Sequence, residues 1–283
     1  MHSMRQKYSI QLLCEVLEVN RSCYYAWQKG HTYQITDKHK TMEKQVIDVF
    51  HQHKRRYGAR RIVAELRNQG VELSRYKARK LLGGNGLKAI QPRSFVPKTT
   101  DSRHTYRISP NLLKERPAPV AVNEVWVGDI TYIPMADSSF RYLSVWMDLF
   151  SRKIVGWDLQ DHMRESLVIA SLRKAVGCRK IKPGLLIHSD RGGQYAGTRF
   201  RQILDRHHKM LQSMSDADNP YDNAYMESFF SRFKAELLEG VAFRNAEDAR
   251  SKIFEFIEMY YNPVRLHSSI GYLSPNAFEK NNN

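Results

Sequence analysis

The chain has 283 residues, with 45 Lys or Arg against 29 Asp or Glu, so its formal charge at pH 7 is +16. Its three cysteines are too few and too scattered for a disulfide framework or a Cys/His zinc site. No apolar run is long enough to cross a membrane, and the first residues lack the apolar segment of a signal peptide. We therefore expect a cytoplasmic protein that is neither disulfide-rich nor membrane-embedded.

The positive charge is concentrated in the first part of the chain. Residues 1–116 contain 24 Lys or Arg and 9 Asp or Glu, a net charge of +15, whereas residues 117–283 contain 21 and 20. This asymmetry predicts that the N-terminal part binds a polyanion. The length also predicts at least two domains, one of them large enough for a substantial hydrophobic core.

Short helices are predicted throughout the basic part. Residues 1–30 form a short helical region that is helix-turn-helix-like, with one helix near residues 10–17 and a second that starts near Arg21, and a polar linker follows over 30–40. From Thr41 the helical pattern resumes, Gly70 ends the next helix, and Ser74 caps the start of a third. Residues 41–88 are thus predicted to be a helix-turn-helix DNA-binding region. The glycine pair at 83 and 84 is expected to end the third helix early.

DNA is the polyanion that the charge pattern favours. Residues 54–98 contain 13 Lys or Arg but only two acidic residues, a density that is unfavourable without a counter-charge, whereas the alternative is a solvated basic surface. We expect double-stranded DNA as the partner and a nucleoid-associated location in the cytoplasm. The candidate DNA-contacting residues are Arg60, Arg61, Arg75, Lys77, Arg79 and Lys80. Residues 89–120 contain several prolines and no periodicity, and are predicted to be a basic linker.

Strands dominate after this linker. Three strands over residues 124–135, 140–150 and 153–160 with short connections predict an antiparallel meander. Helices at 164–177 and 198–208 alternate with strands at 184–189 and 209–215, and two helices follow at about 222–238 and 246–260. The predicted fold is α/β, with a mixed five-stranded sheet and flanking helices over residues 121–279, preceded by the all-α region.

Three carboxylates are the candidate catalytic groups. Asp129 lies inside a predicted strand among apolar residues, where an unpaired carboxylate is costly. Asp190 follows the strand 184–189, at the end of a strand where ligands collect, and Glu227 lies one residue off the apolar stripe of its helix. Taken singly, each has a plain alternative: an outward-facing edge residue, a turn residue and a solvated helix residue. Together they suit two Mg²⁺ or Mn²⁺ ions that assist phosphoryl transfer.

Four motifs occur in an order that resembles a known family. They read "WVGDITYI", "HSDRGGQY", "YDNAYMESFFSRFKAEL" and "YYNPVRLHSSIGYLSP". In order and content they resemble the DDE transposases of bacterial insertion sequences, most closely the second-frame (OrfB type) product of the IS-three family, which is related to retroviral integrases. The segments "YGARRIVAELRNQG" and "NGLKAI" resemble the helix-turn-helix region of that family. The resemblance covers nearly the whole chain.

The resemblance implies a ribonuclease H-like, integrase-like catalytic core and a role for each motif residue. Asp129, Asp190 and Glu227 match the catalytic, metal-binding triad, and Lys234 matches a basic residue that contacts DNA near the reacting phosphate. The gap between Asp190 and Glu227 is 36 residues, one more than is usual in the family, and we place the extra residue in the loop around 206–211. We further expect Asn223 and His188 to be supporting residues, and Asp148 to be the substitute ligand if Asp129 faces away.

The sequence therefore predicts a transposase that cleaves DNA and transfers the strand with the help of metal ions. Two alternatives stay open: a ribonuclease H-like nuclease that hydrolyses without joining, and a catalytically silent DNA-binding regulator. Transposition pairs two DNA ends, so we expect a homo-oligomer on DNA. The resemblance also implies a partner or fusion protein from an upstream reading frame. The segment "RLHSSIGY" has no chemical role that the sequence reveals.

Overall fold

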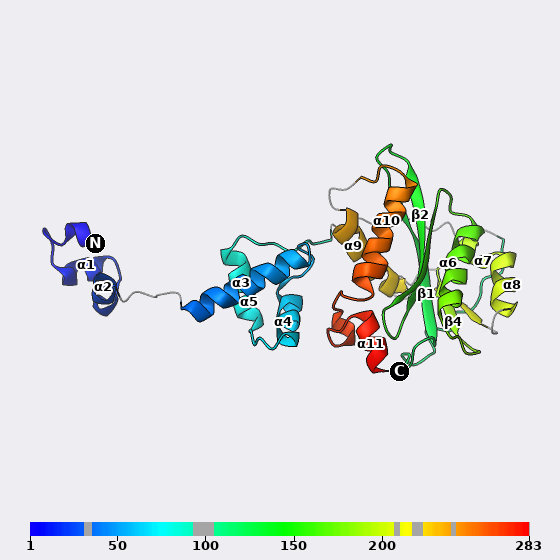
Figure 1. Cartoon of the computed structure of the whole chain (residues 1–283), viewed down its shortest axis with the longest axis horizontal. Helices are drawn as coiled ribbons and strands as arrows, with labels where there is room; N and C mark the ends of the chain where they lie inside the picture. Colours follow the sequence, from blue (N-terminus) through cyan, green and yellow to red (C-terminus); the bar gives the residue numbers. More distant parts are fainter. Residues whose placement is uncertain (31–35, 93–104, 207–209, 217–222, 239–241, 283) are drawn as a thin grey trace.

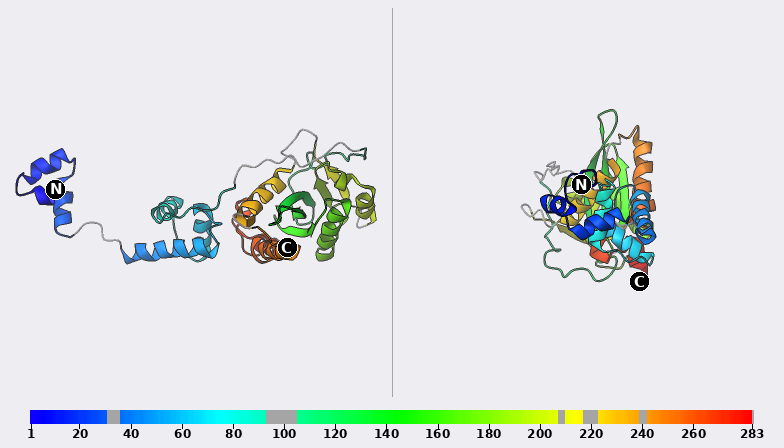
Figure 2. Two further views of the ribbon diagram at one scale, coloured as in Figure 1. Left: turned by 90° about the horizontal axis from the view of Figure 1, so that it is seen from above. Right: turned by 90° about the vertical axis from the view of Figure 1, so that its left-hand side faces the viewer.

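The computed structural model describes residues 1–30, 36–92, 105–206, 210–216, 223–238 and 242–282. Three groups of elements follow one another along the chain: a small N-terminal pair of helices, a second helical group and a larger α/β unit (Figure 1, Figure 2). The α/β unit carries the sheet, and its helices cover both faces.

The N-terminal pair agrees with the prediction. After a short 3-10 turn (η1, His2–Met4) come α1 (Ile10–Val16) and α2 (Arg21–Gln28). The side chain of Ser9 caps α1 by accepting a hydrogen bond from the Leu12 amide, and Asn20 caps α2 in the same way. Each helix thus begins at a polar cap residue and buries only one or two side chains.

Three helices form the second group. They are α3 (Asp37–Gln52), α4 (Ala59–Asn68) and α5 (Arg75–Gly84), and they share a small core that includes Val46, Phe50, Ile62, Leu66 and Ala78. Helix α3 begins four residues before the predicted start, because Thr36 accepts a hydrogen bond from the His39 amide and caps it. The predicted Gly70 stop and Ser74 cap are both observed.

The expectation that Gly83 and Gly84 shorten the third helix was wrong. Helix α5 runs through both glycines and ends at the Asn85 cap, after which Gly86 takes the left-handed conformation with φ of 66°. The side-chain amide of Asn85 donates to the Leu81 carbonyl at 2.9 Å and to Glu43 Oε1 at 2.6 Å. Burial of Leu81 and Leu82 in the core outweighs the low helix propensity of glycine here.

The sheet has the predicted five strands and mixed pairing. Its strands are β1 (Val125–Pro134), β2 (Phe140–Asp148), β3 (Ile154–Gln160), β4 (Leu186–Ser189) and β5 (Leu211–Met214). Their order is β3-β2-β1-β4-β5, with β1, β2 and β3 antiparallel and β4 and β5 parallel to β1. Strand β1 is central, so the alternative of an edge strand around Asp129 is wrong.

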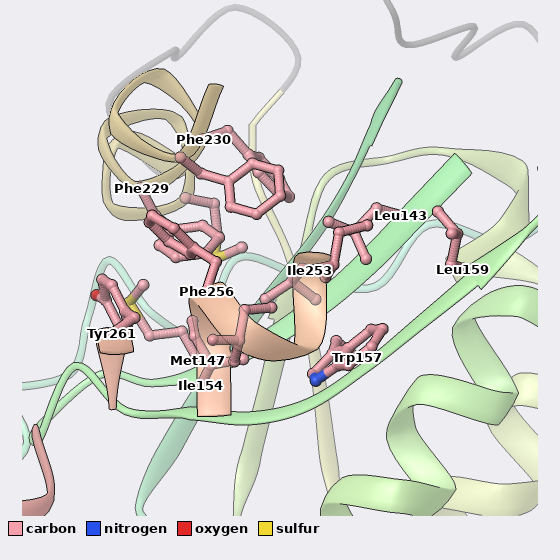
Figure 3. Packing of buried hydrophobic residues seen from close by; sticks show 14 of the residues in the cluster. Leu143, Met147, Ile154, Trp157, Leu159, Phe229, Phe230, Ile253, Phe256 and Tyr261 are labelled. Atoms are coloured by element: carbon pink, nitrogen blue, oxygen red, sulfur yellow. The ribbon is translucent and has the colours of Figure 1, made fainter. Parts of the chain in front are cut away.

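Helices bury both faces of this sheet. On one face lie α9 (Ala224–Leu238), α10 (Ala246–Phe254) and its π-helical continuation η3 (Glu255–Tyr261), and their aromatic side chains pack against β2 and β3 (Figure 3). On the other face α6 (Glu165–Cys178), α7 (Gly193–Ala196) and α8 (Thr198–Arg206) surround Trp126 and Trp146.

Several short elements were not predicted. These are α7, the π-helical turn at the end of α10, the 3-10 turn η4 (Ser268–Ile270) and α11 (Pro275–Asn281). Each is too short or too irregular for a periodic pattern to reveal. The predicted loop around 206–211 falls partly on residues 207–209, and the predicted start of the helix at 222 falls on a residue of the segment 217–222, both outside the described residues.

Replacing Gly156 with alanine is expected to lower the free energy of unfolding by about 1–3 kcal/mol, the usual cost of overpacking. A Cβ at this position in β3 would lie 2.5 Å from the Ser171 carbonyl oxygen and 2.7 Å from the Ala175 Cβ, so α6 would have to move. Urea denaturation measures the change. Gly83→Ala is the matched control: no atom lies within 4 Å of its Cβ, and a helical alanine should stabilise the protein by about 0.5–1 kcal/mol. Equal effects of the two substitutions would contradict this packing.

Candidate active site

Two neighbouring parallel strands place the two aspartates side by side. Val127 of β1 pairs with His188 of β4, and Asp129 and Asp190 each lie two residues beyond this pair. Asp129 Oδ1 accepts a hydrogen bond from the Ile130 amide at 2.7 Å, and Asp190 Oδ1 accepts one from the Gly192 amide at 3.0 Å. Both side chains are half-buried. The register of the sheet therefore brings together two carboxylates that are 61 positions apart in the sequence.

Helix α9 supplies the third carboxylate. Glu227 lies in its first turn with an exposed side chain, and Lys234 lies on the same side two turns later, half-buried. Burial raises the pKa of Asp129 well above its usual value, and the charges of Asp190 and Glu227 raise it further, whereas Lys234 lowers it. Asp129 is thus close enough to Asp190, Glu227 and Lys234 for each of them to act on it electrostatically.

Lys234 is the cation of this cluster. Burial lowers the pKa of Lys234, and the negative charge of Asp129 works in the opposite direction. A half-buried ammonium beside carboxylates offers a single positive charge to an anion that enters the site.

The donor set fits a hard divalent cation. Within the described part of the chain, no group of three or more His, Cys, Asp or Glu side chains is arranged so that it could hold a metal ion. Mg²⁺ and Mn²⁺ do not need such a group, because they accept one or two carboxylates and complete their shell with water and substrate phosphate. Burial raises the pKa of Asp129 most, and repulsion by the negative charges of Asp190 and Glu227 adds to the rise. A divalent cation would remove that repulsion.

Comparison with known proteins decides the family. A model described as "Integrase core domain" matches residues 119–220, a second with the same description matches 208–275, and an "HTH-like domain" matches 37–95. The chain is 40% identical over 241 residues to the transposase for insertion sequence element IS904 of Lactococcus lactis, covering 85% of this chain and 94% of that protein. It is 37% identical over 278 residues to transposase InsF for insertion sequence IS3A of Escherichia coli (strain K12), covering 98% and 96%.

The chain belongs to the IS3 family of transposases. Of the three activities considered from the sequence, transposition is the one that the relatives support, so the transposase is a polynucleotidyl transferase that cleaves DNA and transfers the strand. Its core matches the integrase core models and has the predicted five-stranded mixed sheet with flanking helices, behind an all-helical, HTH-like region. No helix in the described ranges is long and apolar enough to span a membrane.

The transposase is also similar to solved integrases. One is the simian T-cell lymphotropic virus intasome in complex with PP2A regulatory subunit B56 gamma, with 17% identity, a TM-score of 0.48, and coverage of 77% of this chain and 70% of that chain. Another is the trimeric form of the HTLV-2 integrase catalytic core domain in complex with magnesium, with 16% identity, a TM-score of 0.43, and coverage of 56% and 98%.

The residues that the sequence predicts to support the site have different surroundings. His188 is buried, and its Nδ1 lies 2.9 Å from Ser213 Oγ, so this side-chain contact connects strand β4 to strand β5. Asn223 is buried directly before α9, and its side-chain oxygen has no hydrogen-bond partner among the described residues. Asp148 is not a substitute ligand. It is buried and accepts hydrogen bonds from the amides of Asn123 (2.7 Å) and Ser151 (2.9 Å), so it holds the turn after β2.

Tyr195 lies near the two aspartates, although sequence reasoning missed it. This residue of α7 is fully buried, with its ring 5.8 Å from those of Trp146 and Phe200. Burial raises the pKa of the Tyr195 hydroxyl, and the charges of Asp129 and Asp190 raise it further, so the ring lies near both aspartates. The feature of the sequence that could have pointed to Tyr195 is its position at the end of the motif "HSDRGGQY", five residues after Asp190. Its helix is too short to predict.

Tyr195→Phe is expected to slow strand transfer by about fivefold to tenfold, the equivalent of one hydrogen bond. The ring stays in its aromatic contacts, and the variant loses only the buried hydroxyl near the two aspartates. This hydroxyl has no hydrogen-bond partner among the described residues and can donate to an oxygen that enters the site. Rates on a pre-cut DNA end measure the effect, with the melting temperature as a check on folding. Tyr132→Phe on β1 removes the same group away from the carboxylates and should change nothing. An unchanged rate for Tyr195→Phe would remove this residue from the site.

The candidate DNA-contacting residues do not all face solvent. Exposed basic side chains lie on both α4 and α5: Arg60, Arg75, Arg79 and Lys80 are exposed and Lys77 is half-exposed. Arg61 differs, because its Nε donates to the Leu266 carbonyl at 2.9 Å and burial lowers its pKa. Arg61 is thus held in a contact within the protein, and we exclude it from the DNA-contacting set.

Proposed function

We propose that Asp129, Asp190 and Glu227 are the catalytic triad of the transposase and hold divalent metal ions against a DNA phosphate. The observation that carries the proposal is the parallel pairing of β1 with β4, which sets Asp129 beside Asp190. Burial raises the pKa of Asp129, and the charges of Asp190 and Glu227 raise it further, which supports their proximity. Two Mg²⁺ or Mn²⁺ ions would neutralise charge on the phosphate and activate the attacking oxygen. The register of β1 and β4 and the first turn of α9 hold the carboxylates for this task.

The reaction consists of two in-line substitutions at phosphorus. Water first hydrolyses a phosphodiester at the end of the element and frees a 3′-hydroxyl. This hydroxyl then attacks a second phosphodiester, and the 3′-oxygen of the cut target strand leaves. No covalent bond to the protein is needed, so positioning and charge stabilisation provide the rate. Lys234 contributes by binding a phosphate oxygen beside the carboxylates, while Asn223 and His188 support the site.

The second helical group is the proposed DNA-binding region. Its exposed basic residues would contact phosphates of double-stranded DNA, and these contacts are salt-dependent. The domain limits that we propose are 1–30, 41–88, 89–120 and 121–279. We further propose a homo-oligomer on DNA, a partner or fusion from an upstream reading frame, and a nucleoid-associated location in the cytoplasm. The proposed DNA contacts are Arg60, Arg75, Lys77, Arg79, Lys80 and Lys234.

A strand-transfer assay tests the activity and the site together. The full chain is mixed with a labelled, pre-cut fragment that ends at the boundary of the element, with Mg²⁺ or with a chelator. Joined product is expected only with Mg²⁺, and Asp190→Asn should abolish it without loss of DNA binding. Hydrolysis without joined product would favour the nuclease alternative. Unchanged joining by Asp190→Asn would remove Asp190 from the reaction.

A further inference from the structure

The segment 260–266, which we call the docking segment, has no part in the chemistry above. Its sequence is "YYNPVRL", and its first two residues are the last two of the π-helical turn η3. The structure places it between the DNA-binding helices and helix α9, with buried or partly buried contacts on both sides.

On the side of the DNA-binding helices, α4 and the loop before it hold the docking segment. The hydroxyl of Tyr57 accepts a hydrogen bond from the Leu266 amide at 2.7 Å and donates to the Val264 carbonyl at 3.3 Å. Arg61 Nε donates to the Leu266 carbonyl at 2.9 Å. The Leu266 side chain is 5% exposed and belongs to the hydrophobic core of α3, α4 and α5. The segment therefore completes the core of the DNA-binding helices.

On the other side the docking segment contacts helix α9. Arg265 forms two hydrogen bonds to Glu236, from Nε to Oε2 at 2.9 Å and from Nη2 to Oε1 at 2.6 Å, and both side chains are nearly inaccessible to solvent. Arg56 reaches the same residue and donates to its main-chain carbonyl at 3.3 Å, while its guanidinium lies 4.4 Å from the centre of the Tyr260 ring. Bidentate arginine pairs of this kind fix orientation as well as distance.

Helix α9 connects this contact to the active site. Glu227, Lys234 and Glu236 lie on one continuous 15-residue helix. Glu236, which binds Arg265, lies near the C-terminal end of this helix, and the proposed catalytic residue Glu227 lies at its N-terminal end, so the helix joins the two rigidly. A displacement of the DNA-binding helices would therefore act on α9 directly.

We propose that the docking segment fixes the DNA-binding helices relative to the active site and thereby sets which phosphate of a bound DNA end is cut. Tyr57, Arg61 and Arg265 are positioning residues in this scheme and do not contact the reacting atoms. The inference rests on the DNA-binding role proposed for α4 and α5. It also gives a function to Arg265 and Leu266, the first two residues of the segment "RLHSSIGY" that the sequence left without one.

Two neighbouring arginines make a matched test. Arg60 is exposed and is proposed to contact DNA, whereas Arg61 contacts the docking segment. Full-length Arg60→Gln, Arg61→Gln and Tyr57→Phe are compared by DNA affinity and by mapping the cut and joined nucleotides on sequencing gels. Tyr57→Phe keeps the ring and loses only the hydroxyl, so it serves if Arg61→Gln folds poorly.

The proposal predicts a separation of the two readouts. Arg60→Gln should weaken DNA binding by about threefold to tenfold and leave the cut at the same nucleotide. Arg61→Gln and Tyr57→Phe should bind DNA within about twofold of the wild type but spread the cuts over adjacent phosphates. Unchanged cut positions in both folded docking variants would overturn the docking role. If Arg60→Gln binds normally while the docking variants still spread the cuts, the proposed role of Arg60 fails and the docking role stands.

Discussion

Asp129→Asn is expected to reduce strand transfer at least about a thousandfold and, without metal, to stabilise the protein. The loss of activity follows because the amide removes one negative ligand from a set of three. The gain in stability follows because burial and the charges of Asp190 and Glu227 make the ionised form of Asp129 unfavourable. Removing the negative charge of Asp129 therefore stabilises the folded protein.

The sign of the pH dependence separates this prediction from a general effect on folding. The pKa of Asp129 is raised in the folded state above the ordinary value of 3.8, so the folded protein binds more protons than the unfolded chain between these two pKa values. Asp129 thus causes no penalty below about pH 3.8, and stability is lost as the pH rises through the raised pKa.

Urea denaturation in the presence of a chelator measures the effect. At neutral pH Asp129→Asn should unfold with a free energy about 1–2 kcal/mol higher than the wild type, and the difference should disappear near pH 4. Asp137 provides the control, because a hydrogen bond from the Ser139 hydroxyl lowers its pKa and Asp137→Asn should not stabilise. A metal-free Asp129→Asn protein that is less stable than the wild type at neutral pH would contradict the predicted repulsion.

Glu236→Gln is expected to lower the free energy of unfolding by about 3–5 kcal/mol, the cost of leaving a buried charge without its partner. Arg265 would keep its positive charge in a site where its side chain is 3% exposed. The same substitution also weakens the contact of α9 with the docking segment, so the melting of the DNA-binding helices and of the core should separate. Calorimetry and denaturant titration record both changes.

A surface pair on the same part of the molecule gives the matched control. Glu255 lies 3.1 Å from Lys54, but both side chains are at least half-exposed. Glu255→Gln should therefore change the stability by less than about 1 kcal/mol. Similar losses for Glu236→Gln and Glu255→Gln would show that the buried pair does not hold the two parts of the molecule together.

The sheet and the positions of the three carboxylates could be predicted from the sequence because both leave local patterns. The apolar strand around Asp129 and the turn after residues 184–189 each indicate where a strand runs or ends. What brings Asp129 beside Asp190 is the parallel pairing of Val127 with His188, which the strand order allowed but did not prove. The motif resemblance provided the missing partner, Glu227.

The docking contacts could not be predicted because they join residues about two hundred positions apart. Charge counts treated Arg60 and Arg61 alike, yet one faces solvent and the other binds the Leu266 carbonyl. The number of basic residues in a segment does not reveal which arginine will donate a hydrogen bond to a main-chain carbonyl that is distant in the sequence. Tyr195 was missed for a related reason, since its position depends on a four-residue helix with no period of its own.

Metal binding is the most direct measurement of the central claim, that three distant carboxylates act as one metal site. The full chain with a DNA end is titrated with Mn²⁺, and free ion is followed by electron paramagnetic resonance. We expect two bound ions per active site, and at least about tenfold weaker binding for Asp129→Asn, Asp190→Asn and Glu227→Gln, with no change for the exposed Asp205→Asn. Wild-type Mn²⁺ affinity in any of the three triad variants would contradict the account.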